Sequence, residues 1–317
     1  MLLILTSAGD ATADYLASRL EGKSIRYVRI DTDTLLSDVT FAYSVSKPKL
    51  FYRGTEFLPG DISNIWYRRP EALKDDRYSE PGEEKFALSE WGAAIDGFFA
   101  HVPIDLWMNH PASNYRASNK LEQLTSANAL GLQVPDTLVT QDPQALRDFF
   151  ESHHGQVITK PLYQGYVEYA NKKDALIYTN QISWSDLIKL DDLAQCPTFF
   201  QQCIAKKADY RITFVDGEFH TSELLALDDG GVQRCDIRRN NMDDVTARAI
   251  DLPQQIEEKL RLMMKQYGLR FGAIDMALST EGEWIFFEVN PNGQWAWQDI
   301  SWDFDIASSF IRSFGGY

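Results

Sequence analysis

Two short runs of hydrophobic residues stand near the C-terminal end of the sequence, with a turn between them. The runs are residues 271–278 and 283–290, and each has the length of a β-strand. Glu281-Gly282 lies between them and suits a two-residue hairpin turn. The pattern therefore predicts an antiparallel hairpin at 271–290.

The register of this hairpin brings three oxygen-bearing side chains together. If Thr280 pairs with Glu283, then Asp275 lies directly opposite Glu288. Asn290 shares the face of Glu288, because side chains alternate along a strand. Two carboxylates and an amide oxygen are hard ligands of the kind that Mg²⁺ prefers. The hairpin thus carries a candidate magnesium site.

A simpler interpretation of the two carboxylates is that they are solvated polar positions on a half-exposed hairpin. The run at 284–289 is apolar on both faces, so a carboxylate within it is costly unless it is paired. Asp275 and Glu288 would also repel each other unless a cation or a proton lies between them. Both facts favour a bound cation.

Other periodic segments predict further strands and helices. Residues 1–30 predict strand, helix and strand, which is one αβ unit of an open sheet. Helices are also predicted at 253–267 and from Asp303, the expected N-cap of a last helix. A further amphipathic helix is predicted at 83–101. Its expected core face is Phe86, Trp91, Ile95, Phe98 and Phe99.

Residues 198–224 predict three strands with two different connections. The first strand is 198–204, and a polar break at Ala205–Asp209 follows it. The next two strands are joined by Asp216-Gly217, a strong hairpin signal.

Composition narrows the functional classes. The 317 residues are 44% hydrophobic and 24% charged, which is ordinary for a globular protein of two or three domains. The net charge of −15 argues against broad binding of nucleic acid or of anionic membranes. The three cysteines lack metal-ligand spacing and are poor material for a disulfide framework. The start lacks a basic signal-peptide region, and no apolar run has membrane-spanning length, so a cytoplasmic location is expected.

The spacing D…E-x-N in the hairpin resembles the metal site of ATP-grasp ligases. Two longer motifs, FFEVNPNGQWAWQD at 286–299 and WYRRP at 66–70, are more specific. They resemble the ATP-grasp enzymes that cross-link ribosomally made peptides, the microviridin-type (graspetide) macrocyclases. The resemblance covers roughly residues 60–300. It implies a mixture of α/β and α+β structure, with the ATP-grasp fold. The implied parts are an N-terminal open αβ domain at 1–110, a central lid domain at 111–195 and a C-terminal metal-binding domain at 196–317.

The resemblance also implies a nucleotide site. Lys120 and Lys160 would contact the ATP phosphates, and Arg211 would meet the transferred phosphate. Gln202 through its C=O and Ile204 through its N–H would recognise adenine. From the sequence alone, Lys120 is more simply a solvated helix lysine. Lys160, at the end of a buried strand, is costly unless an anion meets it.

The remaining candidate residues would serve metal and substrate. Asp275, Glu288 and Asn290 would hold two Mg²⁺ ions. Many ATP-grasp ligases have an arginine two residues before the first metal aspartate, but Ala273 stands there in this chain. Arg238 is therefore the candidate for holding the acyl-phosphate or the acceptor carboxylate.

Two adjacent arginines, Arg68 and Arg69, end an apolar strand just before a proline. One interpretation is a solvated strand end. The other is an anion clamp or an edge that faces a peptide substrate, which the resemblance of WYRRP favours.

The activity that the resemblance implies is ATP-dependent ligation. Aspartate or glutamate side chains of a precursor peptide with a leader segment would be activated as acyl-phosphates and joined to hydroxyls or amines. The resulting cross-links would be esters or amides, and the enzyme would be a homodimer with no nucleic-acid or membrane partner. Two alternatives stay open. One is a ligase that joins amino acids or small peptides, of glutathione-synthetase-like or ribosomal-protein-glutamylating type. The other is an ATP-binding regulatory protein that has lost turnover.

Overall fold

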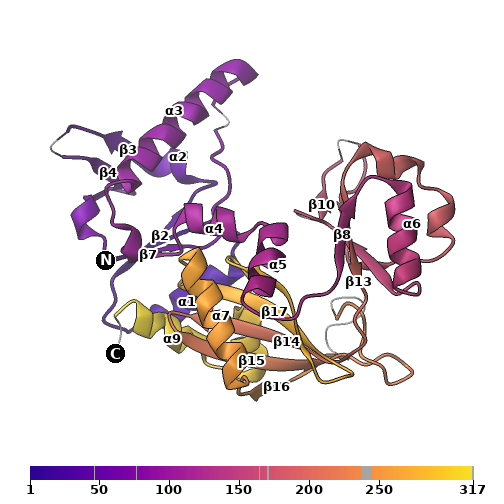
Figure 1. The fold of residues 1–317 in the computed structure, drawn as a ribbon. Coiled ribbons are helices and arrows are strands. Elements are labelled where there is room, and N and C mark those ends of the chain that lie inside the picture. Colours follow the sequence, from indigo (N-terminus) through magenta and orange to yellow (C-terminus); the bar gives the residue numbers. More distant parts are fainter. Residues whose placement is uncertain (46, 76, 164, 170, 238–243, 316–317) are drawn as a thin grey trace.

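Parallel strands at the start of the chain form the first sheet, in the order β2-β1-β6-β7 (Figure 1). The computed structural model describes residues 1–317 apart from 46, 76, 164, 170, 238–243 and 316–317. The predicted strand, helix and strand are confirmed as β1 (Leu2–Thr6), α1 (Ala11–Leu20) and β2 (Tyr27–Asp31). Asp10 caps α1, because its carboxylate accepts the N–H groups of Thr12 and Ala13.

The rest of this N-terminal part adds a small antiparallel sheet, β3-β4-β5, and a long helix. The elements are α2 (Leu35–Asp38), β3 (Val39–Ala42), β4 (Lys49–Tyr52), β5 (Thr55–Phe57), η1 (Pro59–Asp61), β6 (Asn64–Tyr67), α3 (Pro81–Phe99), η2 (Ile104–Leu106) and β7 (Trp107–Met108).

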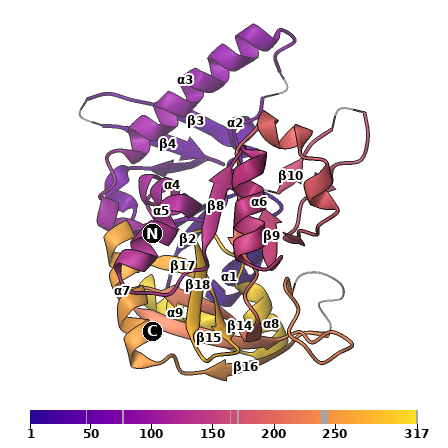
Figure 2. The same ribbon diagram turned by 45° about the vertical axis from the view of Figure 1, so that its right-hand side comes forward.

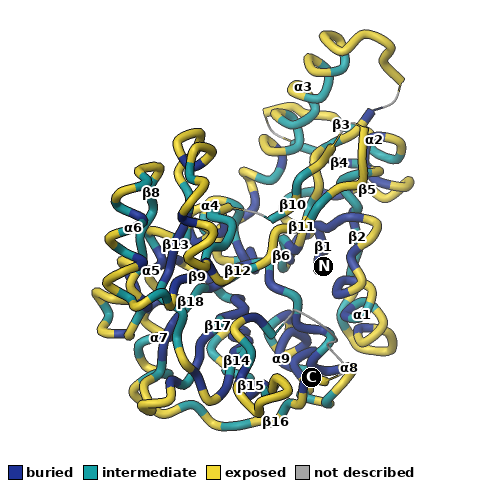
Figure 3. The backbone as a smooth tube through the Cα atoms, turned by 90° about the vertical axis from the view of Figure 1, so that its right-hand side faces the viewer, coloured by how far each residue is buried: buried dark blue, intermediate teal, exposed yellow. Residues whose placement is uncertain are grey.

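Helix α3 confirms the predicted helix but not its predicted packing. Of the five expected core residues, only Phe98 is fully buried, and Phe86 is 68% exposed. The helix projects from the body of the molecule, and most of its length is exposed or half-buried (Figures 1 and 3). Helical spacing of hydrophobic residues predicted the helix, but the apolar face finds little to pack against.

A second, lid-like sheet lies apart from the first, with α6 against it (Figures 1 and 2). Its strand order is β12-β9-β13-β8. We call it the lid sheet. The elements of this region are β8 (Thr137–Thr140), α6 (Pro143–Ser152), β9 (Val157–Lys160), β10 (Tyr166–Val167), β11 (Ala175–Leu176), β12 (Asn180–Gln181), η3 (Asp186–Ile188), η4 (Asp191–Gln195) and β13 (Thr198–Gln202). Because β13 pairs with β8 and β9, sheet membership moves the expected boundary at 195 to the end of β13.

The third sheet is antiparallel and has the order β16-β15-β14-β17-β18. We call it the C-terminal sheet. Its elements are β14 (Lys206–Val215), β15 (Glu218–Leu225), β16 (Thr246–Ile250), β17 (Phe271–Ser279) and β18 (Trp284–Asn290). Helices α4 (Pro111–Ala117), α5 (Lys120–Ala129) and α7 (Gln254–Tyr267) accompany it, and side chains of α5 and α7 share one core with the sheet (Figure 1).

The chain closes with two helices, α8 (Ala296–Trp302) and α9 (Ile306–Ser313), where the sequence predicted one. Asp303 is not an N-cap, as expected, but the left-handed residue that ends α8. Phe310 and Phe314 of α9 point inward as predicted, and they pack with β1 and α1. The N-terminal sheet and the C-terminal helices therefore share one hydrophobic core. In the described part of the chain, no helix combines the length and the apolar character needed to cross a membrane.

Candidate active site

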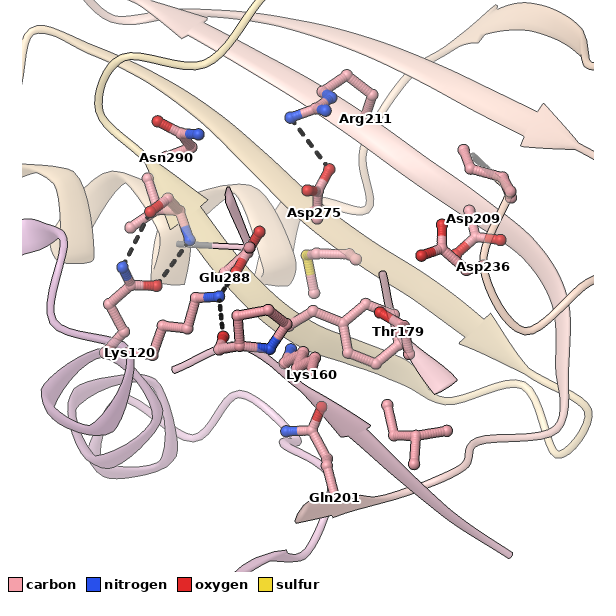
Figure 4. Close-up of a pocket in the computed structure, with 18 of the residues that line it drawn as sticks. Lys120, Lys160, Thr179, Gln201, Asp209, Arg211, Asp236, Asp275, Glu288 and Asn290 are labelled. Carbon is pink, nitrogen blue, oxygen red and sulfur yellow. Dashed lines mark hydrogen bonds and ion pairs between the residues drawn. The ribbon is translucent and has the colours of Figure 1, made fainter. Parts of the chain in front are cut away.

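A cavity of about 680 Å³ is bordered by the lid sheet and the C-terminal sheet. Figure 4 shows side chains from both sheets and from α5 converging on it. Six of the residues predicted from the sequence line this cavity: Lys120, Lys160, Arg211, Asp275, Glu288 and Asn290.

The predicted hairpin forms the floor of the cavity. Asp275 on β17 lies directly opposite Glu288 on β18, as the sequence predicted, and Ala273 lies opposite Asn290. All three candidate ligands are partly exposed to the cavity rather than to the core. The side chains of Asp275 and Glu288 retain 33% and 26% of their exposure.

The turn of the hairpin differs from the prediction by one residue. Ser279 N–H donates to Glu283 C=O at 2.9 Å, so the loop contains the three residues 280–282 rather than two. Alone, this shift would move Glu288 out of register with Asp275. A β-bulge follows, because Met276 pairs with Phe286 while Asp275 pairs with Glu288, and Phe287 is the extra residue. The bulge restores the predicted pairing.

Each carboxylate of the pair has a cation beside it. Arg211 Nη1 lies 3.2 Å from Asp275 Oδ1, since the two residues are cross-strand neighbours on β14 and β17. Lys120 Nζ lies 3.4 Å from Glu288 Oε2 and donates to Pro161 C=O at 3.0 Å. These contacts offset the repulsion between the carboxylates and place positive charge where an anionic ligand can meet it.

Lys160 reaches the same cavity from the lid sheet. It ends β9, and its Nζ lies 5.1 Å from the centre of the Phe199 ring on β13. Because β9 belongs to the lid sheet and Lys120 to α5, the two lysines approach the cavity from different elements (Figure 4).

The donor atoms fit Mg²⁺. Two carboxylates and the amide of Asn290 provide hard oxygens on one face of the hairpin. Asn290 Oδ1 accepts the N–H of Asn292 at 2.9 Å, which orients the amide. Among the described residues no group of three or more His, Cys, Asp or Glu side chains is arranged for a metal ion. The set here has only two carboxylates, as is common for Mg²⁺ that also binds substrate phosphates.

The sequence matches the family model described as prokaryotic glutathione synthetase, ATP-grasp domain, over residues 122–282. This match covers just over half of the chain. The chain belongs to the ATP-grasp family. It is an ATP-grasp ligase of the ADP-forming class, and the cavity lies largely within and beside the matched residues.

Solved structures of ATP-grasp enzymes resemble the whole chain. The macrocyclase MdnC from Microcystis aeruginosa MRC, bound with precursor peptide MdnA, is 26% identical with a TM-score of 0.83, and the match covers 99% of both chains. A Chryseobacterium gregarium ATP-grasp ligase, in complex with ADP and a leader and core peptide, is 25% identical with a TM-score of 0.83. That match covers 99% of this chain and 96% of the other. Macrocyclase MdnB from Microcystis aeruginosa MRC is 27% identical with a TM-score of 0.79, covering 99% and 98% of the chains. Among curated proteins, none matches this sequence.

The residues expected to recognise adenine lie at the exit of the lid sheet of this ATP-grasp enzyme. Gln202 is the last residue of β13, and Ile204 follows in the connection to β14. The cavity lining includes their neighbour Gln201 but neither of these two. Gln201 Nε2 donates to Thr137 Oγ1 at 2.9 Å. The adenine-binding role of Gln202 and Ile204 stays a prediction.

The two adjacent arginines have different environments. Arg68 is fully buried, and its Nη2 donates to Gln294 Oε1 at 2.8 Å. Its Nη1 donates to Asn292 C=O, and its Nε lies 3.6 Å from Asp10 Oδ2. Arg69 is exposed, and its Nε donates to Asn292 C=O at 3.2 Å. Arg68 is therefore neither a solvated strand end nor a surface clamp, because it ties β6 to the loop that follows β18. Arg238 lies outside the described residues.

Sequence reasoning missed a buried charge cluster at the side of the cavity. The expected polar break at Ala205–Asp209 is wrong, since β14 already begins at Lys206. Lys206 Nζ contacts Asp209 Oδ1 at 2.6 Å, and Gln233 Nε2 donates to Asp209 Oδ2 at 2.7 Å. Burial raises the pKa of Asp209, and the Lys206 ammonium opposes that rise. Charged residues next to a strand suggested a loop, but these charges satisfy one another inside.

His220 and Glu223, considered as aids to deprotonation of a nucleophile, do not line the cavity. His220 Nε2 lies 2.8 Å from Ser309 Oγ on α9, and burial lowers the pKa of the imidazole. Glu223 accepts the Tyr210 hydroxyl at 3.0 Å and pairs with Arg248. Both side chains have structural partners on the C-terminal sheet.

Proposed function

We propose that this ATP-grasp ligase cross-links a ribosomally made precursor peptide through its own acidic side chains. The observation that carries the proposal is the likeness to MdnC, which extends over 99% of both chains and thus includes every part of the fold. The structure of MdnC holds a precursor peptide, and the Chryseobacterium gregarium ligase holds ADP with a leader and core peptide. The substrate of this chain would accordingly be a peptide with a leader segment.

In this proposal Asp275, Glu288 and Asn290 hold Mg²⁺, with two ions expected. Bound there, the metal would offset negative charge on the ATP phosphates during transfer. The pairs of Asp275 with Arg211 and of Glu288 with Lys120 support this assignment, because they place the carboxylates and the cations in one cavity.

The reaction would proceed in two transfers. A carboxylate oxygen of the peptide attacks the γ-phosphorus of ATP, the bond to the β-phosphate oxygen breaks, and ADP leaves. A hydroxyl or amine of the same peptide then attacks the acyl carbon and loses its proton, and phosphate leaves. An ester or amide results, with the net loss of one water from the peptide. Lys120, Lys160 and Arg211 would supply positive charge that is already in place around the phosphates.

The substrate peptide would also meet residues outside the nucleotide site. Arg69 lines a second cavity of about 490 Å³ at the carboxyl ends of β1 and β6. In open α/β sheets, ligands bind at this edge, where the chain turns to either side of the sheet. We propose Arg69 as a peptide contact and Arg68 as its buried support, and we keep Arg238 as the candidate for the acceptor carboxylate. A homodimer is the proposed assembly, in the three-part domain division predicted from the sequence.

A ligase of amino acids or small peptides is the second candidate. The family model that matches residues 122–282 is that of a prokaryotic glutathione synthetase, which favours this alternative. It differs from the first candidate in joining separate molecules rather than two side chains of one peptide.

The deciding experiment is the intact mass of a candidate precursor peptide after incubation with the protein, ATP and Mg²⁺. The peptide used is one encoded beside the gene, with acidic and Thr- or Lys-rich repeats. We expect mass losses in whole units of one water, each accompanied by one ADP, because every cross-link condenses a carboxyl group with a hydroxyl or amine.

The Asp275→Asn variant serves as the control, and its peptide should keep its full mass. ADP formation with free amino acids but no mass loss in the peptide would favour the second candidate. No ADP with either substrate would leave a nucleotide-binding role alone.

A further inference from the structure

The outer edge of β18 is covered by a side chain rather than by another strand. Strand β18 is the last in the C-terminal sheet, so alternate backbone groups along it face away from β17. At Val289 these groups are paired with one amide of α5. Val289 N–H donates to Gln123 Oε1 at 2.8 Å, and Gln123 Nε2 donates to Val289 C=O at 2.9 Å. Gln123 thus imitates the backbone of a neighbouring strand.

The Gln123 side chain is itself held in one position. It is only 2% exposed, and its Nε2 also donates to Ala117 C=O at the end of α4. A buried amide with every contact satisfied has little freedom to move. The backbone of Val289 is therefore fixed by two opposed hydrogen bonds to an immobile group.

Val289 stands between Glu288 and Asn290, whose side chains face the cavity. Lys120, which contacts Glu288 at 3.4 Å, lies one turn before Gln123 on the same helix. A single turn of α5 thus fixes both the backbone and the charge partner of this segment. We propose that Gln123 is a positioning residue that sets the Mg²⁺ ligands Glu288 and Asn290, an inference that rests on the proposed metal site.

The test is Mn²⁺ binding, followed by electron paramagnetic resonance in the presence of ADP. Gln123→Met keeps the length of the side chain but removes both hydrogen bonds, and we expect its Kd for Mn²⁺ to rise about 10–100-fold. Gln123→Glu keeps the acceptor for Val289 N–H and loses the donor, so it should lie between the two if Gln123→Met does not fold.

A matched control separates positioning from general destabilisation. Ser126→Ala removes another buried polar group of α5, which faces Glu122 and Gln266 instead of β18. This variant should lower the Tm without changing the Kd for Mn²⁺. Wild-type Mn²⁺ binding that is lost in Asp275→Asn but unchanged in both Gln123 variants would overturn the positioning role. Failure of the wild type to bind Mn²⁺ would instead contradict the proposed metal site.

Two cysteines at the rim of the same cavity carry a second, independent inference. Cys203 lies in the connection between β13 and β14, and Cys235 lies in the loop between β15 and β16. Their Sγ atoms are 3.6 Å apart although the residues are 32 positions apart. Cys235 lines the cavity, and Lys206 Nζ donates to its C=O at 3.0 Å.

The surroundings favour ionisation of one thiol of this pair. The hydrogen bond from Cys203, together with the Lys206 ammonium, lowers the pKa of Cys235 to about 7. The pKa of Cys203 is raised by the same hydrogen bond and by burial. Thiolates are the reactive form of cysteine, and Cys235 is exposed to solvent.

We propose that Cys203 and Cys235 form a reversible disulfide when the enzyme meets a hydroperoxide. The Cys235 thiolate attacks one peroxide oxygen, becomes a sulfenic acid and releases hydroxide (or an alkoxide). Cys203 sulfur then attacks the sulfenic sulfur, water leaves, and the S–S bond forms at about 2.05 Å. Two electrons pass from the two sulfurs to the peroxide. The bond would tether the connection between the lid sheet and the C-terminal sheet to the loop beside the cavity.

The third cysteine provides the control, because Cys196 is exposed and lies outside this pair. After treatment with hydrogen peroxide, we expect intact mass to show the loss of two hydrogens and thiol titration to fall from three groups to one. Dithiothreitol should restore both values. Cys196→Ser should still lose two hydrogens, whereas Cys203→Ser and Cys235→Ser should not. Loss of two hydrogens in either of these last variants, or no such loss in the wild type, would overturn the proposal, and neither result depends on the peptide activity.

Discussion

The Asp275→Asn and Glu288→Gln variants are expected to lose ADP formation by about 10³-fold or more, which corresponds to about 4 kcal/mol of transition-state stabilisation. Each substitution keeps the shape of the side chain but removes a negative charge that a metal would need. It also leaves Arg211 or Lys120 without its carboxylate partner inside the cavity. The measurement is the rate of ADP release with the peptide as substrate.

Glu283→Gln is the matched control for these variants. Glu283 belongs to the same hairpin, but it is exposed beside the turn and does not line the cavity. Its rate should equal that of the wild type. Retention of ADP formation within about tenfold in Asp275→Asn, a difference of only about 1.4 kcal/mol, would contradict the metal assignment. Circular dichroism should show that all three variants are folded.

Trp295→Ala is expected to reduce the free energy of unfolding by about 3–5 kcal/mol. The indole is fully buried and stacks on Phe310, with ring centres 4.7 Å apart and planes 19° apart. It also meets the edge of Tyr15 at 5.9 Å. Truncation would open a large cavity between α1, α8 and α9, which urea unfolding monitored by circular dichroism would detect.

Trp295→Phe separates the loss of volume from the loss of the indole N–H. Trp295 Nε1 is buried and has no hydrogen-bond partner among the described residues, so its removal should cost little. We expect Trp295→Phe to be clearly more stable than Trp295→Ala. Equal losses in the two variants would show that ring stacking contributes little. Trp295 belongs to the motif that resembles the macrocyclases, so part of that motif serves packing.

The pairing of Asp275 with Glu288 was predictable, but the reason it holds was not. The prediction assumed a two-residue turn and a regular ladder, whereas the structure has a three-residue turn and a bulge at Phe287. These departures shift the register in opposite directions and cancel. Because a shift of one residue moves a strand's side chains to the other face, either departure alone would have separated the carboxylates.

Burial of charge was the feature that the sequence concealed most. Lys206 and Asp209 resembled a polar loop, and Arg68 resembled a strand end, since charged residues are usually exposed. In the structure each has partners that are distant in sequence, such as Asn292 and Gln294 for Arg68. Local patterns predict strands and helices, but they do not contain the long-range contacts that decide whether a charge is buried.

The hydrophobic core that joins the two ends of the chain has a consequence for the order of folding. Leu2, Ile4 and Leu16 pack in one cluster with Ile306 and Phe310 of α9. During synthesis the N-terminal sheet leaves the ribosome long before α9 exists, so one apolar face of β1 and α1 has no partner in that interval. We expect the first region to be made to be among the last to reach its native packing, which makes it the part of the nascent chain with the greatest need of a chaperone.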